Sequence, residues 1–133
     1  MKTLSIASTP ETPGVHFDSQ NNIFEIRGKS VPDDAENFYA PILEWFDEYM
    51  KQPNSETAVT IDLEYFNISS SKRLLFLLYK LNDLNTEKGG ARIKWMYNQD
   101  DEDMFEVGQD YAFMVKIPFD FVSYATQKVS LVS

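Results

Sequence analysis

The chain has 133 residues, 21 of them acidic and 12 basic, which gives a net charge of −9, and 43% are hydrophobic. This composition excludes intrinsic disorder, and the length is typical of one domain. The acidic balance argues against nucleic-acid binding, because neutralising phosphates requires clustered Lys and Arg. The absence of cysteine excludes disulfides and cysteine-based metal sites, and a single histidine, His16, excludes sites built from paired histidines.

No apolar run approaches the roughly 20 residues that span a bilayer. The N-terminus also lacks the apolar segment of a secretory signal. We therefore expect a cytoplasmic protein without membrane contact. Residues 1–133 should form one domain with its core at about 8–125 and a loose tail after Ala125, in which Val129–Val132 is a possible edge strand.

The first half of the chain predicts an extended lead-in, a β-hairpin and a helix. The hairpin pairs Val15–Asp18 with Ile23–Lys29 across four polar residues. The helix begins near Pro32, with acidic residues at the positive end of its dipole. Pro41 lies inside the helix pattern and either kinks the helix or marks a late start. The apolar positions of this helix fall within an arc of about 160°. They are Phe38, Tyr39, Ile42, Leu43, Trp45, Phe46, Tyr49 and Met50.

Residues 56–66 alternate between apolar and polar side chains, as a strand does. One face carries Val59, Ile61, Leu63 and Tyr65, and the other carries Thr60, Asp62 and Glu64. The polar face predicts a sheet that is covered on one side only. The elements expected after it are a helix from about Ser70 to Asn85 ended by Gly89-Gly90, a strand Ala91–Tyr97, a helix Asp100–Met114 and a strand Ile117–Tyr124. The predicted fold is a two-layer α/β domain with a mixed sheet and helices mainly on one face.

The sequence contains no recognisable catalytic, cofactor or metal motif. The acidic run Asp100–Asp103 lacks the ligand spacing of an EF-hand, and acids at the start of a helix offset its dipole. The five glycines form no phosphate-binding loop. We therefore predict no cofactor, no metal and no enzymatic activity.

The segment that stands out is the turn Asn67–Ser71, which joins a strand to a helix and holds three serines. One interpretation is helix capping, in which Asn67, Ser69 or Ser70 accepts a free backbone N–H and contributes about 1 kcal/mol. The other interpretation is phosphorylation, because a phosphate would meet the positive end of the helix and would add charge to a surface.

The helix that follows this turn carries apolar residues on more than one side. Its core-facing positions fill an arc of about 120°. They are Leu74, Leu77, Leu78, Leu81 and Leu84. A second group, Leu75, Phe76 and Tyr79, lies beside Lys72. This group either adds to the core or docks a partner next to a charge switch.

Five segments in order carry a resemblance to a known family. They are Ser8–Pro13, Gly28–Asp34, Phe38–Trp45, Tyr65–Lys72 and Ile93–Tyr97. Tyr65–Lys72 is similar to the family motif Y-x-N-T-S-S-x-K, and Gly28–Asp34 to its G-x-S-x-P-E-N. The chain resembles the SiaC-type regulatory phosphoproteins, whose fold is similar to STAS domains and to bacterial anti-sigma factor antagonists.

This resemblance implies a partner switch. A kinase phosphorylates such a protein at the N-T-S-S turn, a PP2C-type phosphatase removes the phosphate, and the unphosphorylated form activates a diguanylate cyclase. The output is cyclic-di-GMP signalling, which favours biofilm or aggregation. Ile68 occupies the family's acceptor position and has no hydroxyl, so Ser69 and Ser70 are the remaining acceptor candidates. The partner-binding candidates are Asn67, Ser71, Lys72, Leu75, Phe76 and Tyr79.

Two other readings stay open. The first is a constitutive protein-binding module, or an anti-sigma factor antagonist of the same fold, that is not phosphorylated. The second is an enzyme, against which the missing motifs argue.

Overall fold

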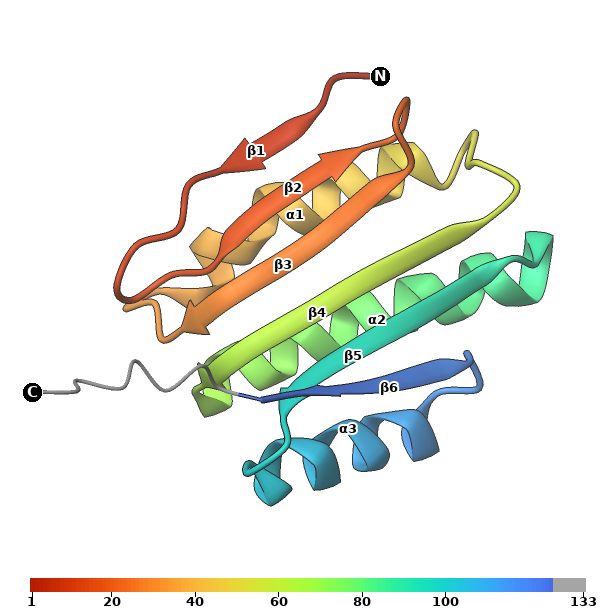
Figure 1. Ribbon diagram of the computed structural model, residues 1–133. Helices are drawn as coiled ribbons and strands as arrows, with labels where there is room; N and C mark the ends of the chain where they lie inside the picture. The colour runs from red at the N-terminus through yellow and green to blue at the C-terminus, as the bar shows by residue number, and fades with distance from the viewer. Residues whose placement is uncertain (126–133) are drawn as a thin grey trace, which may run out of the picture.

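The computed structural model describes residues 1–125, which form six strands and three helices (Figure 1). The strands are β1 (Leu4–Ile6), β2 (Gly14–Asp18), β3 (Ile23–Ser30), β4 (Thr57–Phe66), β5 (Ala91–Asn98) and β6 (Phe119–Tyr124). The helices are α1 (Ala35–Tyr49), α2 (Ile68–Lys88) and α3 (Glu102–Met114). Every helix and strand predicted within residues 1–125 is present, and the possible strand Val129–Val132 lies outside the described residues. β1 was predicted only as part of an extended lead-in.

All six strands form one sheet in the order β1-β2-β3-β4-β5-β6. The pairs β1–β2 and β2–β3 are antiparallel, whereas β3–β4, β4–β5 and β5–β6 are parallel. Each parallel pair is joined through one helix, and in Figure 1 α1 and α2 lie behind the sheet while its near face carries no helix. The predicted fold class is confirmed, and Asp62 and Glu64 lie on the uncovered face as expected.

One predicted orientation on β4 is wrong. Val59, Ile61 and Leu63 are buried as predicted, but the side chain of Tyr65 is 54% exposed. The pairing of β3 with β4 shifts between Gly28 and Lys29, so that Gly28 pairs with Leu63 and Lys29 pairs with Tyr65. The extra residue of this β-bulge reverses the alternation beyond it, and Phe66 takes the place on the core side.

Helix α1 packs an aromatic cluster against the hairpin. Its side-chain arc is as predicted, with Tyr39, Ile42, Phe46 and Tyr49 fully buried. The neighbouring rings in the cluster have centroids 5.0 to 6.2 Å apart, and the cluster consists of Phe17, Phe24, Trp45, Phe46 and Tyr49. The late-start alternative is wrong, because Asp34 caps the helix and α1 begins at Ala35, well before Pro41.

Helix α3 packs closely against β5 because residue 108 is glycine. A Cβ at Gly108 would lie 2.5 Å from the indole nitrogen of Trp95, so any larger residue would push the helix away. That indole nitrogen donates a hydrogen bond to the backbone carbonyl of Met104 at 3.0 Å. Trp95 therefore fixes the distance of α3 from the sheet, and α3 lies on the same side as the other two helices.

Candidate functional site

The turn between β4 and α2 is closed by the side chain of Asn67. The residue is extended, with φ −84° and ψ 174°, and its side-chain oxygen accepts a hydrogen bond from the amide of Ser70 at 2.9 Å. The amide of Ser71 donates to the backbone carbonyl of Asn67 at 3.0 Å. Asn67 is thus the N-cap among the three predicted candidates. Helix α2 begins two residues earlier than predicted, which places Ser69 and Ser70 in its first turn.

The two predicted acceptor serines lie in opposite environments. Ser69 is exposed, whereas Ser70 is fully buried. The hydroxyl of Ser70 donates to the backbone carbonyl of Ser30 at 3.1 Å and accepts from the Ser30 hydroxyl at 2.8 Å. Ser69 is therefore accessible from solvent and Ser70 is not. The helical period carried a signal for this difference, because Ser70 lies four and seven residues before the buried Leu74 and Leu77.

Large apolar side chains lie exposed at the turn itself. Ile68, at the first position of α2, is 88% exposed, and Tyr65 just before the turn is 54% exposed. Ser71 is half-buried, and its hydroxyl donates to the backbone carbonyl of Ile68 at 2.7 Å. The exposed part of the turn therefore consists of Ile68 and the neighbouring Ser69.

The outer side of α2 continues this surface with apolar and cationic side chains. Leu75 packs partly against the core, Phe76 is half-buried and Tyr79 is 44% exposed. The Nζ of Lys72 lies 5.9 Å from the centroid of the Phe76 ring, and the guanidinium carbon of Arg73 lies 5.4 Å from it. The second apolar group of this helix, Leu75, Phe76 and Tyr79, is thus half-exposed, with two cations near the Phe76 ring.

Sequence reasoning missed two exposed apolar residues on α3. Phe113 is 93% exposed and Met114 is 56% exposed. Helix α3 runs beside α2, since the Tyr111 hydroxyl donates to the backbone carbonyl of Ser71 and the Lys116 amide donates to the Asn82 side chain, each at 3.0 Å. Burial raises the pKa of Tyr111 to about 12. A signal for Phe113 was present, because at 100° per residue it lies roughly opposite the buried Tyr111.

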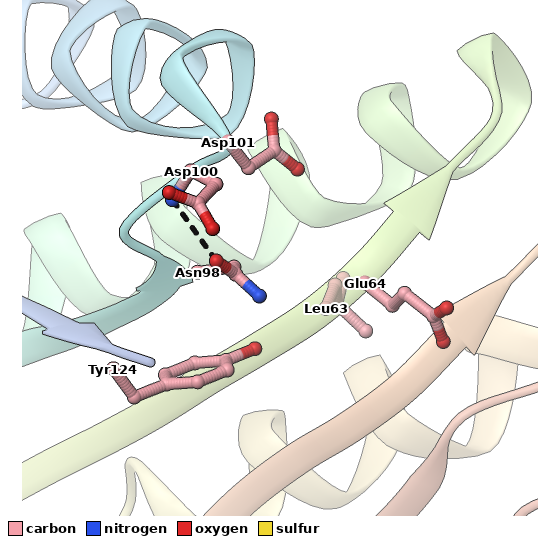
Figure 2. Close-up of a pocket in the computed structure, with 6 residues that line it drawn as sticks. All are labelled: Leu63, Glu64, Asn98, Asp100, Asp101 and Tyr124. Atoms are coloured by element: carbon pink, nitrogen blue, oxygen red, sulfur yellow. Dashed lines mark hydrogen bonds between the residues drawn. The ribbon is translucent and has the colours of Figure 1, made fainter. Parts of the chain in front are cut away.

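A separate hollow of about 370 Å³ lies at the carboxyl ends of the parallel strands (Figure 2). Its lining residues are Leu63, Glu64, Asn98, Asp100, Asp101 and Tyr124. Two of its polar side chains serve the local fold. Asp101 caps α3 by accepting from the amide of Met104 at 3.0 Å, and Asn98 accepts from the amide of Asp100 at 2.9 Å, the dashed line in Figure 2. The acidic run therefore starts a helix, as the sequence suggested.

The hydroxyl of Tyr124 donates to Asp62 at 3.0 Å beside this hollow. Burial, followed by this hydrogen bond and the charge of Asp62, raises the pKa of Tyr124 to about 12. Within residues 1–125, no group of three or more His, Cys, Asp or Glu side chains could hold a metal ion. His16 lies on β2, where its Nδ1 is 3.0 Å from the Ser5 hydroxyl. None of the described helices is long and apolar enough to cross a membrane.

Known proteins of similar sequence and structure come from Pseudomonas aeruginosa. An uncharacterized protein of strain UCBPP-PA14 is 22% identical over 119 residues, which cover 90% of this chain and 94% of that protein. The fold resembles that of apo-SiaC, with a TM-score of 0.86, 20% identity and coverage of 92% of this chain and 99% of SiaC. It also resembles SiaC as the activator in complex with diguanylate cyclase SiaD, with a TM-score of 0.86, 21% identity and coverage of 91% and 99%.

The family described as SiaC family regulatory phosphoprotein matches residues 6–124, which include the whole turn Asn67–Ser71 and all three helices. This match spans most of the chain and agrees with the resemblance carried by the sequence motifs. The chain belongs to the SiaC family of regulatory phosphoproteins.

Proposed function

We propose that this chain is a non-enzymatic regulator that binds and activates a diguanylate cyclase and is released from it when Ser69 is phosphorylated. The observation that carries the proposal is the position of Ser69, which is exposed at the second residue of α2, one helical turn before Lys72 and Arg73. The choice of partner is supported by the similar SiaC of P. aeruginosa, which is the activator in a complex with a diguanylate cyclase.

We assign the cyclase to the outer side of α2, which we call the docking surface. It comprises Asn67, Ser71, Lys72, Leu75, Phe76 and Tyr79. Half-exposed aromatic side chains at the centre of a surface are typical anchors of protein–protein contacts. The exposed side of the neighbouring helix α1 is acidic, with Glu44, Asp47 and Glu48. Desolvating these carboxylates costs more free energy than desolvating the apolar side chains of α2.

Phosphorylation of Ser69 changes this surface in two ways. A phosphate adds about two negative charges at the start of α2, where free amides and the helix dipole stabilise it. Lys72 and Arg73, at i+3 and i+4, are its nearest neighbours on the helix surface. Both cations lie near the ring of Phe76 in the unmodified protein, and Arg73 also lies 3.7 Å from the Glu36 carboxylate, so the phosphate competes with the ring and with Glu36 for them. The modified surface is both more charged and less covered at its central aromatic.

The proposed switch requires a cognate protein kinase and a PP2C-type phosphatase, as the family resemblance implies. A kinase reaction consumes ATP, so we place the chain in the cytoplasm. No nucleic-acid partner is proposed, because the net charge is −9.

A constitutive binding module is the second candidate function, and one observation favours it. Ile68 occupies the acceptor position of the family motif and is 88% exposed. An apolar side chain at that place can contact the partner permanently and cannot be charged. In this case the docking surface is the same, but no phosphate regulates it.

Two measurements separate these functions. In the first, the purified chain is incubated with its cognate kinase, and mass spectrometry identifies the residue that carries phosphate. Phosphate on Ser69 supports the phosphorylation switch. The second measures affinity for the diguanylate cyclase of the native host. We expect Ser69→Asp to weaken binding at least about tenfold, about 1.4 kcal/mol, and Ser69→Ala to bind like the wild type.

Ser123→Asp is the matched control, because Ser123 is also exposed but lies on β6, outside the docking surface. It should leave the affinity unchanged. If the kinase places no phosphate anywhere from Asn67 to Ser71, the chain is a constitutive module.

A further inference from the structure

Three buried hydroxyl groups from three different elements meet beneath the turn Asn67–Ser71. Ser30 ends β3, Tyr39 lies in α1 and Ser70 lies in the first turn of α2, and the exposed fraction of each is 0%. The Ser30 hydroxyl is 2.6 Å from the Tyr39 hydroxyl and 2.8 Å from the Ser70 hydroxyl.

The protons in this cluster have one consistent arrangement. The Ser30 hydroxyl donates to the Ser70 hydroxyl, and the Ser70 hydroxyl donates to the Ser30 backbone carbonyl at 3.1 Å. Each hydroxyl has one proton, so the remaining bond is donated by Tyr39 to the Ser30 hydroxyl. Burial raises the pKa of Tyr39, which keeps its phenol protonated as this arrangement requires.

Ser30 also holds the turn by its backbone. Its carbonyl accepts from the amide of Asn67 at 3.0 Å as well as from the Ser70 hydroxyl. The Asn67 side chain in turn accepts from the amide of Ser70. Asn67 and Ser70 are therefore both hydrogen-bonded to Ser30 at the end of β3. Ser30 is in turn hydrogen-bonded to Tyr39 of α1.

We propose that Ser30, Tyr39 and Ser70 are positioning residues that fix the turn Asn67–Ser71 in the shape that presents Ser69 and Ile68 outward. Ser70 is then the internal anchor of the turn and is not a phosphate acceptor. If the Ser70 hydroxyl turned outward to a kinase, the Ser30 hydroxyl and carbonyl would lose their hydrogen-bond partner in a dry interior, which is costly. The inference deepens the proposed function, since the turn it concerns is the proposed site of modification.

The chain offers a matched control on the same helix. The Tyr49 hydroxyl, also buried, is 2.7 Å from the Thr57 hydroxyl and accepts from the amide of Asn54 at 3.0 Å. Tyr49 lies ten residues after Tyr39 in α1, about 15 Å along the helix axis. Tyr39→Phe and Tyr49→Phe each remove one buried hydroxyl from α1, but only Tyr39 touches the cluster beneath the turn.

The first experiment measures amide hydrogen exchange in the full, unmodified chain. The reporters are the amides of Ser70 and Ser71, which are both bonded to Asn67. We expect Tyr39→Phe to speed their exchange by about tenfold or more and Tyr49→Phe to leave it unchanged, although both variants shift the denaturation midpoint. Equal exchange at the turn in the two variants would overturn the proposal, because the cluster would then act only on global stability.

The second experiment treats wild type, Ser69→Ala and Ser70→Ala with the cognate kinase. We expect Ser70→Ala to accept phosphate on Ser69, but more slowly than the wild type because its turn is less well fixed, and Ser69→Ala to accept none. Phosphate on Ser70 would overturn the positioning role. If the wild type accepts no phosphate at all, the proposed switch fails, while the exchange measurement in the unmodified chain still decides whether the three hydroxyls position the turn.

Discussion

The uncovered face of the sheet and the outer side of α2 are both accessible to solvent, but they differ in the chemistry of their exposed side chains. The sheet face carries charged groups that are paired with one another, and the helix carries large apolar groups. On the sheet face, Arg27 binds Asp62 at 2.9 Å, Tyr124 donates to Asp62 at 3.0 Å, and Arg92 binds Asp120 at 2.8 Å. These groups already have partners on their own chain. A protein docking there would have to desolvate charges that gain little from it.

The outer side of α2 has the opposite character. Ile68 and Tyr79 are exposed to 88% and 44%, and although Arg73 pairs with Glu36 at 3.7 Å, the large exposed side chains here are apolar. Removing apolar surface from water is favourable by about 25 cal/mol per Å². The comparison favours the outer side of α2 over the open sheet face as the proposed partner site, because its large exposed side chains are apolar.

The largest effect is expected at the centre of the docking surface. Phe76→Ala should weaken binding of the diguanylate cyclase by about 1–3 kcal/mol, as loss of a central aromatic anchor does. The domain should stay folded, because the ring is only half-buried. Calorimetric titration of the cyclase with wild type and variant measures the effect. A variant that loses several degrees of melting temperature but binds normally would place Phe76 in the core and not at the interface.

A change on the sheet face should act on stability alone. Asp62→Ala leaves Arg27 and Tyr124 without their shared acceptor, and we expect a loss of about 1–2 kcal/mol in the free energy of unfolding. Affinity for the cyclase should not change. Urea denaturation together with the same titration tests both parts, and a weaker complex would show that the sheet face takes part in binding.

Alkaline pH should have a smaller effect, through Tyr124 on the sheet face and Tyr111 on the helix side of the sheet. Tyr111 and Tyr124 have pKa values raised to about 12, mainly by burial, above the value near 10 of an unfolded tyrosine. The stabilisation from the protonated phenols is complete below about pH 10 and is lost as the pH rises through 12. Urea denaturation between pH 8 and 12 should show this decline, and Tyr124→Phe should make it shallower. An identical slope in the variant would contradict the assignment to Tyr124.

The smallest effect is expected for an exposed ion pair. The side chains of Arg92 and Asp120 are 51% and 47% exposed. Arg92→Gln should therefore change the free energy of unfolding by about 1 kcal/mol or less, and should leave cyclase binding unchanged. A tenfold loss of affinity in this variant would show that the cyclase binds the sheet face and not the outer side of α2.

Much of the architecture was predictable because it depends on local periodicity. The buried stripes of α1 and α2, the glycines with positive φ after α2 and the polar face of β4 all follow from the spacing of side chains along the chain. Tyr65 was placed wrongly, because a bulge depends on the pairing of β4 with β3. Gly28, with φ 121° in the partner strand, lies where the register shifts.

The sequence by itself determined that a serine-rich turn with three candidate caps, Asn67, Ser69 and Ser70, precedes an amphipathic helix, because capping and helical periodicity act within a few residues. The helical period favoured Ser70 as the inward-facing serine, but only the tertiary structure decided which groups hold it there. Ser70 is held inside by the hydroxyl and carbonyl of Ser30, which are forty residues away, and through Ser30 by Tyr39. Such hydrogen bonds exist only after β3, α1 and α2 have packed together, and their strength comes from the dry interior that this packing creates.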